Sequence, residues 1–362
     1  MAATVDIEKY RRIEFARNEV TGAVGDSITV LPIVVALAVV TEVSLPHVLV
    51  AFGIFQIVWG VVYGLPISVE PMKALAALAI AGGLTHAELA LSGLVLGVVL
   101  LVIGTTGTLA AVERWIGEPV VRGVQLAVGL ILLETAVGIA AEDPTVAAAG
   151  IVIAAASVAA GYGSASALIV LLAGGGATLA IAGLPMPQLP GAPSVPPLAE
   201  GATRRAAEGT FAQLAMTVGN AALATSLLLA ERFDADVSAD ELSMSMGAMN
   251  LIAVPIGGIP MCHGCDGVAG KHAFGARTGG ANVILGVGYL GAALFATSQL
   301  LAAFPLALLG VLLAIVSISL SRSVLKSSNL PLSVAIGVGA VVFNLGVAFL
   351  VGVLVHLVIK RL

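Results

Sequence analysis

The feature that most constrains this chain is a succession of apolar segments that continues through nearly its whole length. Of its 362 residues, 59% are hydrophobic and only 10% are charged, whereas a soluble domain carries about 25% charged residues. A membrane-spanning helix needs about 20 consecutive apolar residues, so this length allows about 14 spans joined by short loops. The composition therefore predicts an all-α polytopic membrane protein without a large soluble domain.

Glycine, proline and charged residues divide the apolar segments into two sets of seven. The first set covers roughly residues 21–42, 46–64, 66–82, 87–105, 119–140, 145–161 and 164–183. The second covers roughly residues 209–230, 242–259, 261–275, 278–297, 299–320, 330–344 and 346–359. A proline-rich stretch separates them. We therefore predict a first repeat over residues 1–183, a linker over 184–203 and a second repeat over 204–362.

Basic residues are distributed unevenly between alternate loops. If the amino terminus is inside and the chain crosses 14 times, the outer loops carry only Arg204 and Arg205. Lys73 then lies within the membrane, and every other lysine and arginine falls on a cytoplasmic segment, with Lys271 at the border of a span. Cytoplasmic loops are enriched in Lys and Arg. The pattern predicts a multi-pass protein of the plasma membrane with both termini in the cytoplasm.

The two sets of spans match each other at a constant offset of 194 residues. Matching pairs include Glu14 and Glu208, Gly25 and Gly219, Asp26 and Asn220, Gln56 and Asn250, and Pro66 and Pro260. Because seven is an odd number, the second copy must be inverted in the membrane. Inverted repeats with broken helices near the midplane are a recurring design of secondary transporters.

The third span carries charged residues inside an apolar run, in the segment Leu65-Pro-Ile-Ser-Val-Glu-Pro-Met-Lys73. Its prolines predict extended residues 67–69 and a helix that begins at Pro71. The tenth span repeats this pattern in Pro260-Met-Cys-His-Gly-Cys-Asp266. In an inverted repeat the two helix amino termini face each other, and such ends favour anions. Lys73 adds a full positive charge, or it extends to a membrane interface instead.

Ionisable and hydroxyl side chains near these helix ends are candidates for binding or proton transfer, because such groups are costly at membrane depth. Glu70 either carries a coupled proton or forms a fixed i, i+3 ion pair with Lys73, and both readings stay open. Asp26 either takes a proton or is solvated at the cytoplasmic mouth. The candidate substrate-binding residues are Asp26, Ser27, Thr29, Ser68, Glu70, Met72, Lys73, Asn220, Cys262, His263 and Gly264.

The segment Cys262-His-Gly-Cys265 has the spacing of a redox pair or of half a metal site. No second cluster of Cys or His completes four ligands, so we expect no metal and no cofactor. His263 is a candidate donor or proton carrier. Asp266 is another proton-coupling candidate, or it caps the helix of the tenth span.

Three motifs in this chain resemble those of the molybdate transporter family, which is related to the sulfate permeases. They are Gly25-Asp-Ser-Ile-Thr-Val-Leu-Pro-Ile33, Tyr63-Gly-Leu-Pro-Ile-Ser-Val-Glu-Pro-Met-Lys-Ala74, and Gly257-Gly-Ile-Pro-Met-Cys-His-Gly264 with its continuation to Gly280. The resemblance extends over nearly the whole chain. Family members often have glutamine at the position of Glu70, and small neutral residues near Cys265 and Asp266. The additional acid points to proton coupling.

The resemblance implies a 7+7 transmembrane inverted repeat like that of sulfate and uracil permeases, with short β-like segments at spans 3 and 10. It implies a core of spans 1–4 and 8–11 and a gate of spans 5–7 and 12–14. It also implies import of molybdate, or sulfate, by alternating access. We expect a coupling proton and membrane lipid as partners, allow a homodimer, and expect no nucleic acid. A nucleobase or carboxylate symporter, an intramembrane thiol oxidoreductase and a passive anion channel are the alternatives.

Overall fold

The computed structural model describes residues 13–361, most of them helical. The first half contains α1 (Arg17–Val40), α2 (Leu45–Tyr63), β1 (Glu70–Pro71), α3 (Lys73–Ile80), α4 (His86–Thr106), α5 (Leu109–Ile116), α6 (Glu118–Ala140), α7 (Pro144–Ala159), η1 (Gly163–Ala165) and α8 (Ser166–Ala182). The segment that follows contains only the short turn η2 (Leu198–Gly201).

The second half begins with a continuous helix made of α9 (Arg204–Met216), the π-helical turn η3 (Thr217–Ala224) and α10 (Thr225–Phe233). It continues with α11 (Ala239–Ala253), η4 (Val254–Ile256), β2 (Met261–Cys262), α12 (Cys265–Ala273), α13 (Gly280–Ala293), α14 (Ser298–Ala302), α15 (Leu306–Arg322), η5 (Ser323–Lys326), α16 (Leu330–Val342) and α17 (Leu345–Ile359). These elements coincide with the predicted order of spans.

Seven helices in the described part of the chain are long and apolar enough to cross a membrane, namely α1, α2, α4, α6, η1–α8, α9–η3–α10 and α15–η5. Four shorter apolar helices, α7, α13, α16 and α17, accompany them. Together with α11 and the two broken segments around α3 and α12, they occupy the positions of the 14 predicted spans. The chain is therefore a multi-pass membrane protein.

The packing of the helices has the symmetry of an inverted repeat. Helix α2, the second span, packs along α13, the eleventh, while α11, the ninth span, packs along α4, the fourth. These two pairs are equivalent when the halves are exchanged. Helix α1 packs on α12 in the same way that α9 packs on α3. The prediction of two related halves is thus confirmed by their contacts.

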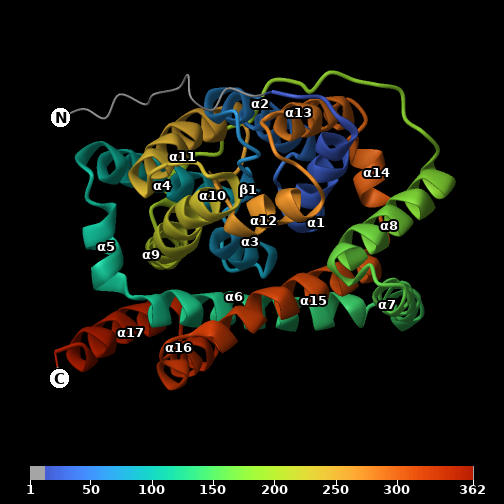
Figure 1. Cartoon of the computed structure of the whole chain (residues 1–362). Helices are drawn as coiled ribbons and strands as arrows, with labels where there is room; N and C mark the ends of the chain where they lie inside the picture. The colour runs from blue at the N-terminus through green and yellow to red at the C-terminus, as the bar shows by residue number, and fades with distance from the viewer. Residues whose placement is uncertain (1–12, 362) are drawn as a thin grey trace.

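The helices form two bundles, which Figure 1 shows one above the other. The core bundle contains α1–α4 and α9–α13. The second bundle contains α6–α8 and α15–α17, in which α6 packs along both α15 and α16, while the short α14 lies between α1 and α8. The assignment of these bundles as core and gate remains a prediction.

The two broken spans meet in the middle of the core bundle. Strands β1 and β2 pair antiparallel, with Glu70 opposite Cys262 and Pro71 opposite Met261. The predicted β-like segments are therefore confirmed. Pro71 lies in the strand, and α3 begins two residues later at Lys73, because the backbone N–H of Met72 is used in a hydrogen bond to the carbonyl of Pro260 at 2.9 Å.

Two features differ from the predicted spans. The amphipathic helix α5 lies between the fourth and fifth spans and was not predicted; it is too short to cross a membrane. The predicted span 299–320 is interrupted at Pro305, which precedes α15, so the crossing helix begins at Leu306. Of the basic residues assigned to the cytoplasm, Lys9, Arg11 and Arg12 lie outside the described residues.

Candidate functional site

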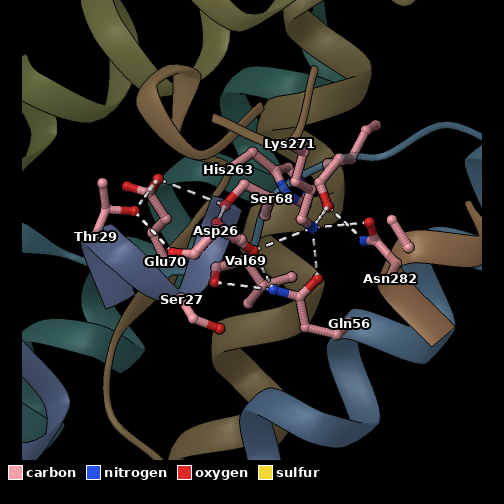
Figure 2. Close-up of polar contacts among 12 residues, drawn as sticks. Asp26, Ser27, Thr29, Gln56, Ser68, Val69, Glu70, His263, Lys271 and Asn282 are labelled. Atoms are coloured by element: carbon pink, nitrogen blue, oxygen red, sulfur yellow. Dashed lines mark hydrogen bonds and ion pairs between the residues drawn. The ribbon is translucent and has the colours of Figure 1, made fainter. Parts of the chain in front are cut away.

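A fully buried ion pair lies at the centre of the core bundle. Asp26 of α1 and Lys271 of α12 are both 0% exposed, and Lys271 Nζ lies 3.0 Å from Asp26 Oδ2 (Figure 2). Asp26 also accepts hydrogen bonds from Gln56 Nε2 at 2.6 Å and from the hydroxyl of Ser68. A buried charge persists only when it is paired and hydrogen-bonded, and this carboxylate has both kinds of partner. Asp26 is therefore not solvated at a cytoplasmic mouth.

Lys271 fastens the extended segment that precedes β1. Its ammonium donates to Gln56 Oε1 at 2.9 Å, to the carbonyl of Ile67 at 3.0 Å and to Asn282 Oδ1 at 2.7 Å (Figure 2). The amide of Asn282 donates to the same carbonyl. The sequence placed Lys271 at the border between a cytoplasmic segment and a span, and the structure places its side chain in the core.

A second charged cluster adjoins the first. Lys73 Nζ lies 2.9 Å from Glu70 Oε2 and 2.9 Å from Asp266 Oδ2, so this lysine joins β1 to the first turn of α12. Glu70 is 1% exposed and also accepts a hydrogen bond from Thr29 at 3.3 Å. The hydroxyl of Ser68 donates to Asp26 and lies 3.5 Å from Glu70, which links the two clusters.

The combined network contains more acids than bases. Its carboxylates are Asp26, Glu70 and Asp266, and its ammonium groups are Lys73 and Lys271. With all five groups ionised, the network has one excess negative charge. A dianion placed among them is repelled unless a carboxylate takes up a proton or a cation arrives from elsewhere.

The amino terminus of α3 already has a partner. The side-chain oxygen of Gln213, from α9, accepts hydrogen bonds from the backbone N–H groups of Ala74 at 2.8 Å and Leu75 at 3.4 Å. The N–H of Met72 is used in the strand pairing. The backbone N–H of Met72 is therefore not free for a ligand, and Lys73 is what α3 offers to an anion.

The amino terminus of α12 faces the carboxylate of Glu70. A Cβ atom added at Gly264 would lie 1.9 Å from Glu70 Cδ, and one added at Gly267 would lie 2.4 Å from Glu70 Oε1. Both positions need glycine, because the Glu70 carboxylate lies directly against the backbone at Gly264, and the side chains of Ser68, Asp26 and Glu70 all lie against it at Gly267. Gly264 is the N-cap of the helix, so Asp266 is not the cap; it lies in the first turn and binds Lys73.

His263 connects two backbone elements through both ring nitrogens. Nδ1 lies 2.9 Å from the carbonyl of Ser68, and Nε2 lies 2.8 Å from the hydroxyl of Ser245. Since a carbonyl only accepts, Nδ1 carries a proton and donates a hydrogen bond to Ser68. The ring is fully buried against Trp59 and Tyr63.

The remaining candidates divide between the core and a cavity. Ser27 Oγ lies 3.4 Å from the hydroxyl of Tyr289 in the core. Cys262 is buried, and its thiol faces the carbonyl of Pro71 at 4.0 Å. In contrast, Thr29 and Asn220 line a cavity of about 980 Å³. Asn220 lies in the π-helical turn η3, and π-helical turns are frequent at functional sites.

This cavity lies between the two bundles. Its walls come from α1, α3 and α12 on one side and from α6–α8 and α15 on the other. Lys73 and Asp266 are on the core wall, and Asp266 has 55% of its side chain exposed. The cavity thus reaches the charged cluster at the broken helices, which is where a ligand can meet both bundles.

Sequence reasoning missed Lys271, Asn282 and Gln213 as parts of the site. For Gln213 a signal existed, because it lies 194 residues after Glu19, and the two play equivalent parts. Glu19 accepts hydrogen bonds from the backbone of Arg277, Thr278 and Ala281 before and in the first turn of α13. Both repeat mates therefore satisfy backbone N–H groups at the start of a helix in the other half.

The fold and this central charged site together define a membrane transporter rather than an enzyme. A family model described as "Molybdate transporter of MFS superfamily" matches residues 18–132 and 205–320. The chain belongs to this molybdate transporter family, as its motifs predicted. It is 31% identical to "Molybdate transporter 1" of Arabidopsis thaliana, over 84% of this chain and 79% of that one. It is 29% identical to "Molybdate transporter 2" of the same plant, over 84% and 78% of the two chains.

Solved structures with the same fold are known. The transmembrane domain of the cyanobacterial bicarbonate transporter BicA aligns with a TM-score of 0.66 at 16% identity, over 95% of this chain and 99% of that one. The anion transporter Slc26a9 from mouse, in its inward-facing state, aligns with a TM-score of 0.67 at 13% identity, over 98% and 69% of the chains. At these identities the likeness establishes the fold, an inverted repeat of seven plus seven spans.

Proposed function

We propose that this chain is a secondary active transporter that imports a tetrahedral oxyanion, molybdate foremost, by alternating access coupled to a proton. The observation that carries the proposal is the position of Lys73 and the first turn of α12 on the wall of the cavity between the bundles. An ammonium beside helical N–H groups is a suitable environment for an oxyanion. The names of the curated relatives supply molybdate as the first substrate to test.

In the proposed mechanism the carboxylate of Glu70 occupies the anion-binding position when no substrate is bound. Its carboxylate lies against the first turn of α12 and beside Lys73, where an incoming oxyanion would bind. Protonation of Glu70 removes the excess negative charge of the network and weakens its hold on Lys73. The anion then binds the ammonium of Lys73 and the amino terminus of α12 in place of Glu70. The anion and the proton therefore enter the site together.

Asp26 and His263 have other parts in this proposal. Asp26 is held by Lys271, Gln56 and Ser68, so it helps to fix the extended segment that precedes β1. His263 is occupied at both ring nitrogens and serves as a structural link. The predicted proton transfer is thereby assigned to Glu70, with Asp266 as the second partner of Lys73.

The test is calorimetric titration of the purified protein with molybdate, with sulfate as the competitor. Lys73→Ala should weaken molybdate binding by roughly thirtyfold or more, because it removes one charged partner from a buried site. Lys360→Ala, at an exposed position after α17, is the matched control and should bind like the wild type. If the wild type binds neither anion, an oxyanion substrate is excluded.

Uptake by proteoliposomes tests the coupling. An inwardly directed proton gradient should accelerate molybdate uptake, and a protonophore should abolish the acceleration. Uptake that follows only the membrane potential and does not saturate would instead identify a passive channel. Changing both Cys262 and Cys265 to serine should leave uptake intact, because the proposed mechanism uses neither thiol, whereas an intramembrane thiol oxidoreductase would lose its activity.

A further inference from the structure

The charges of the cavity differ from those of the buried network. Four basic side chains line it, from Lys73, Arg122, Arg322 and Lys326, whereas its acidic lining in the described chain is Asp266 alone. Of the four, only Lys73 belongs to the core bundle. The other three lie on α6, at the end of α15 and in η5, so the second bundle supplies most of the positive charge that an anion meets.

These basic residues are gathered at one end of the second bundle. The start of α6 is joined to the segment after η5, because Glu118 accepts hydrogen bonds from the backbone and the hydroxyl of Ser328 at 3.0 and 2.7 Å. By the distribution of basic residues, this is the end predicted to face the cytoplasm. A cleft with one sign of charge raises the local concentration of its counter-ions.

Arg122 differs from the other two in being held in place. Its Nε donates to Glu118 at 3.0 Å and its NH1 donates to Gln125 at 3.2 Å, while 28% of the side chain is exposed. A guanidinium group carries five N–H donors, and the hydrogen bonds of Arg122 in the described structure use two of them. The remaining donors form the free edge of the group. Arg122 is also close enough to Asp266 to interact with it electrostatically.

From this arrangement we infer that Arg122 is the second bundle's ligand for the transported oxyanion. The inference rests on the proposed function and names the residue that couples anion binding to movement of the bundles. The anion binds Lys73 on the core wall and accepts hydrogen bonds from the free edge of Arg122 on the facing wall. Arginine suits this role because its planar donors match oxyanions in a bidentate manner.

The anion then acts as a bridge that draws the two walls together. Without it, the cations of the second bundle face both Lys73, which repels them, and Asp266, which attracts them, on the core wall. With a dianion between them, Lys73 and the cations of the second bundle both gain an attractive partner, so closure of the bundles is favoured more strongly when substrate is present. Arg322 and Lys326 concentrate anions at the mouth without binding them in a fixed geometry.

Three variants test the inference in lipid-free detergent and in proteoliposomes. Arg122→Gln should weaken molybdate affinity about tenfold or more, the loss expected for a charged hydrogen bond, and should lower the maximal uptake rate. Arg122→Lys keeps the positive charge but loses the planar pair of N–H donors, so it should restore only part of the affinity for molybdate. Arg322→Gln is the matched control, and its smaller effect should disappear when the salt concentration is raised above about 0.15 M.

The outcomes separate this inference from the proposed function. If Lys73→Ala abolishes binding while Arg122→Gln binds and transports like the wild type, the oxyanion site stands and the role of Arg122 is overturned. If added salt removes the effect of Arg122→Gln as well, Arg122 only attracts anions and the bridge is also overturned. A defect that appears only in liposomes with anionic lipid, with unchanged affinity in detergent, would assign Arg122 to a lipid phosphate instead.

Discussion

Asp26 and Lys271 form an ion pair in which neither side chain is exposed, and it joins the middle of α1 to α12 across the centre of the core bundle. Breaking a buried pair by removing one partner leaves an uncompensated charge and costs about 3–5 kcal/mol. Lys271→Met should therefore lower the thermal stability of the detergent-solubilised protein strongly. It should also lower uptake, because the carbonyl of Ile67 loses one of its donors.

The double variant Asp26→Asn with Lys271→Met provides the control for this pair. It leaves no isolated charge, so it should be more stable than Lys271→Met alone. If the double variant is as unstable as the sum of the single changes, the two residues do not act as a pair and this account of the core is wrong.

Glu70→Gln tests the proposed proton carrier. Glutamine imitates the protonated acid, so the variant should bind molybdate with an affinity that no longer depends on pH. In the wild type the affinity should fall as the pH rises, because the ionised carboxylate competes with the anion for Lys73 and α12. Titrations between about pH 5.5 and 8 measure the difference, and Glu142→Gln, at an exposed position, should retain the wild-type profile. An unchanged slope in Glu70→Gln would assign the proton elsewhere.

The sequence predicted the architecture well because membrane spans and repeats leave strong signals. Apolar runs marked the helices, and the match between Pro66 and Pro260 located both broken spans. The partners of each charge were less accessible, because they depend on which helices meet. Lys271 lies on a helix that packs on α1, and no local pattern distinguishes a lysine paired with Asp26 from one that faces the cytoplasm.

Local sequence patterns also do not show which glycines lie where two helices are in contact. Helix α13 contains Gly286 and Gly288 two residues apart, yet only the first lies at a helix contact. A Cβ atom at Gly286 would lie 2.5 Å from the carbonyl oxygen of Gly53 in α2, whereas one at Gly288 meets nothing within 4 Å. Gly286→Ala should therefore destabilise the protein by about 1–3 kcal/mol through overpacking. Gly288→Ala should have little effect, and equal melting temperatures for the two variants would contradict the described packing of α2 on α13.

His263→Ala separates a structural link from a proton carrier. The change removes the hydrogen bonds to the carbonyl of Ser68 and to Ser245, each worth about 0.5–1.5 kcal/mol, and it leaves a cavity beside Trp59. We expect a lower melting temperature and a reduced amount of folded protein. The pH dependence of molybdate uptake by the protein that does fold should remain that of the wild type, because Glu70 is unaltered. A variant with wild-type stability but a flattened pH profile would identify His263, and not Glu70, as the proton carrier.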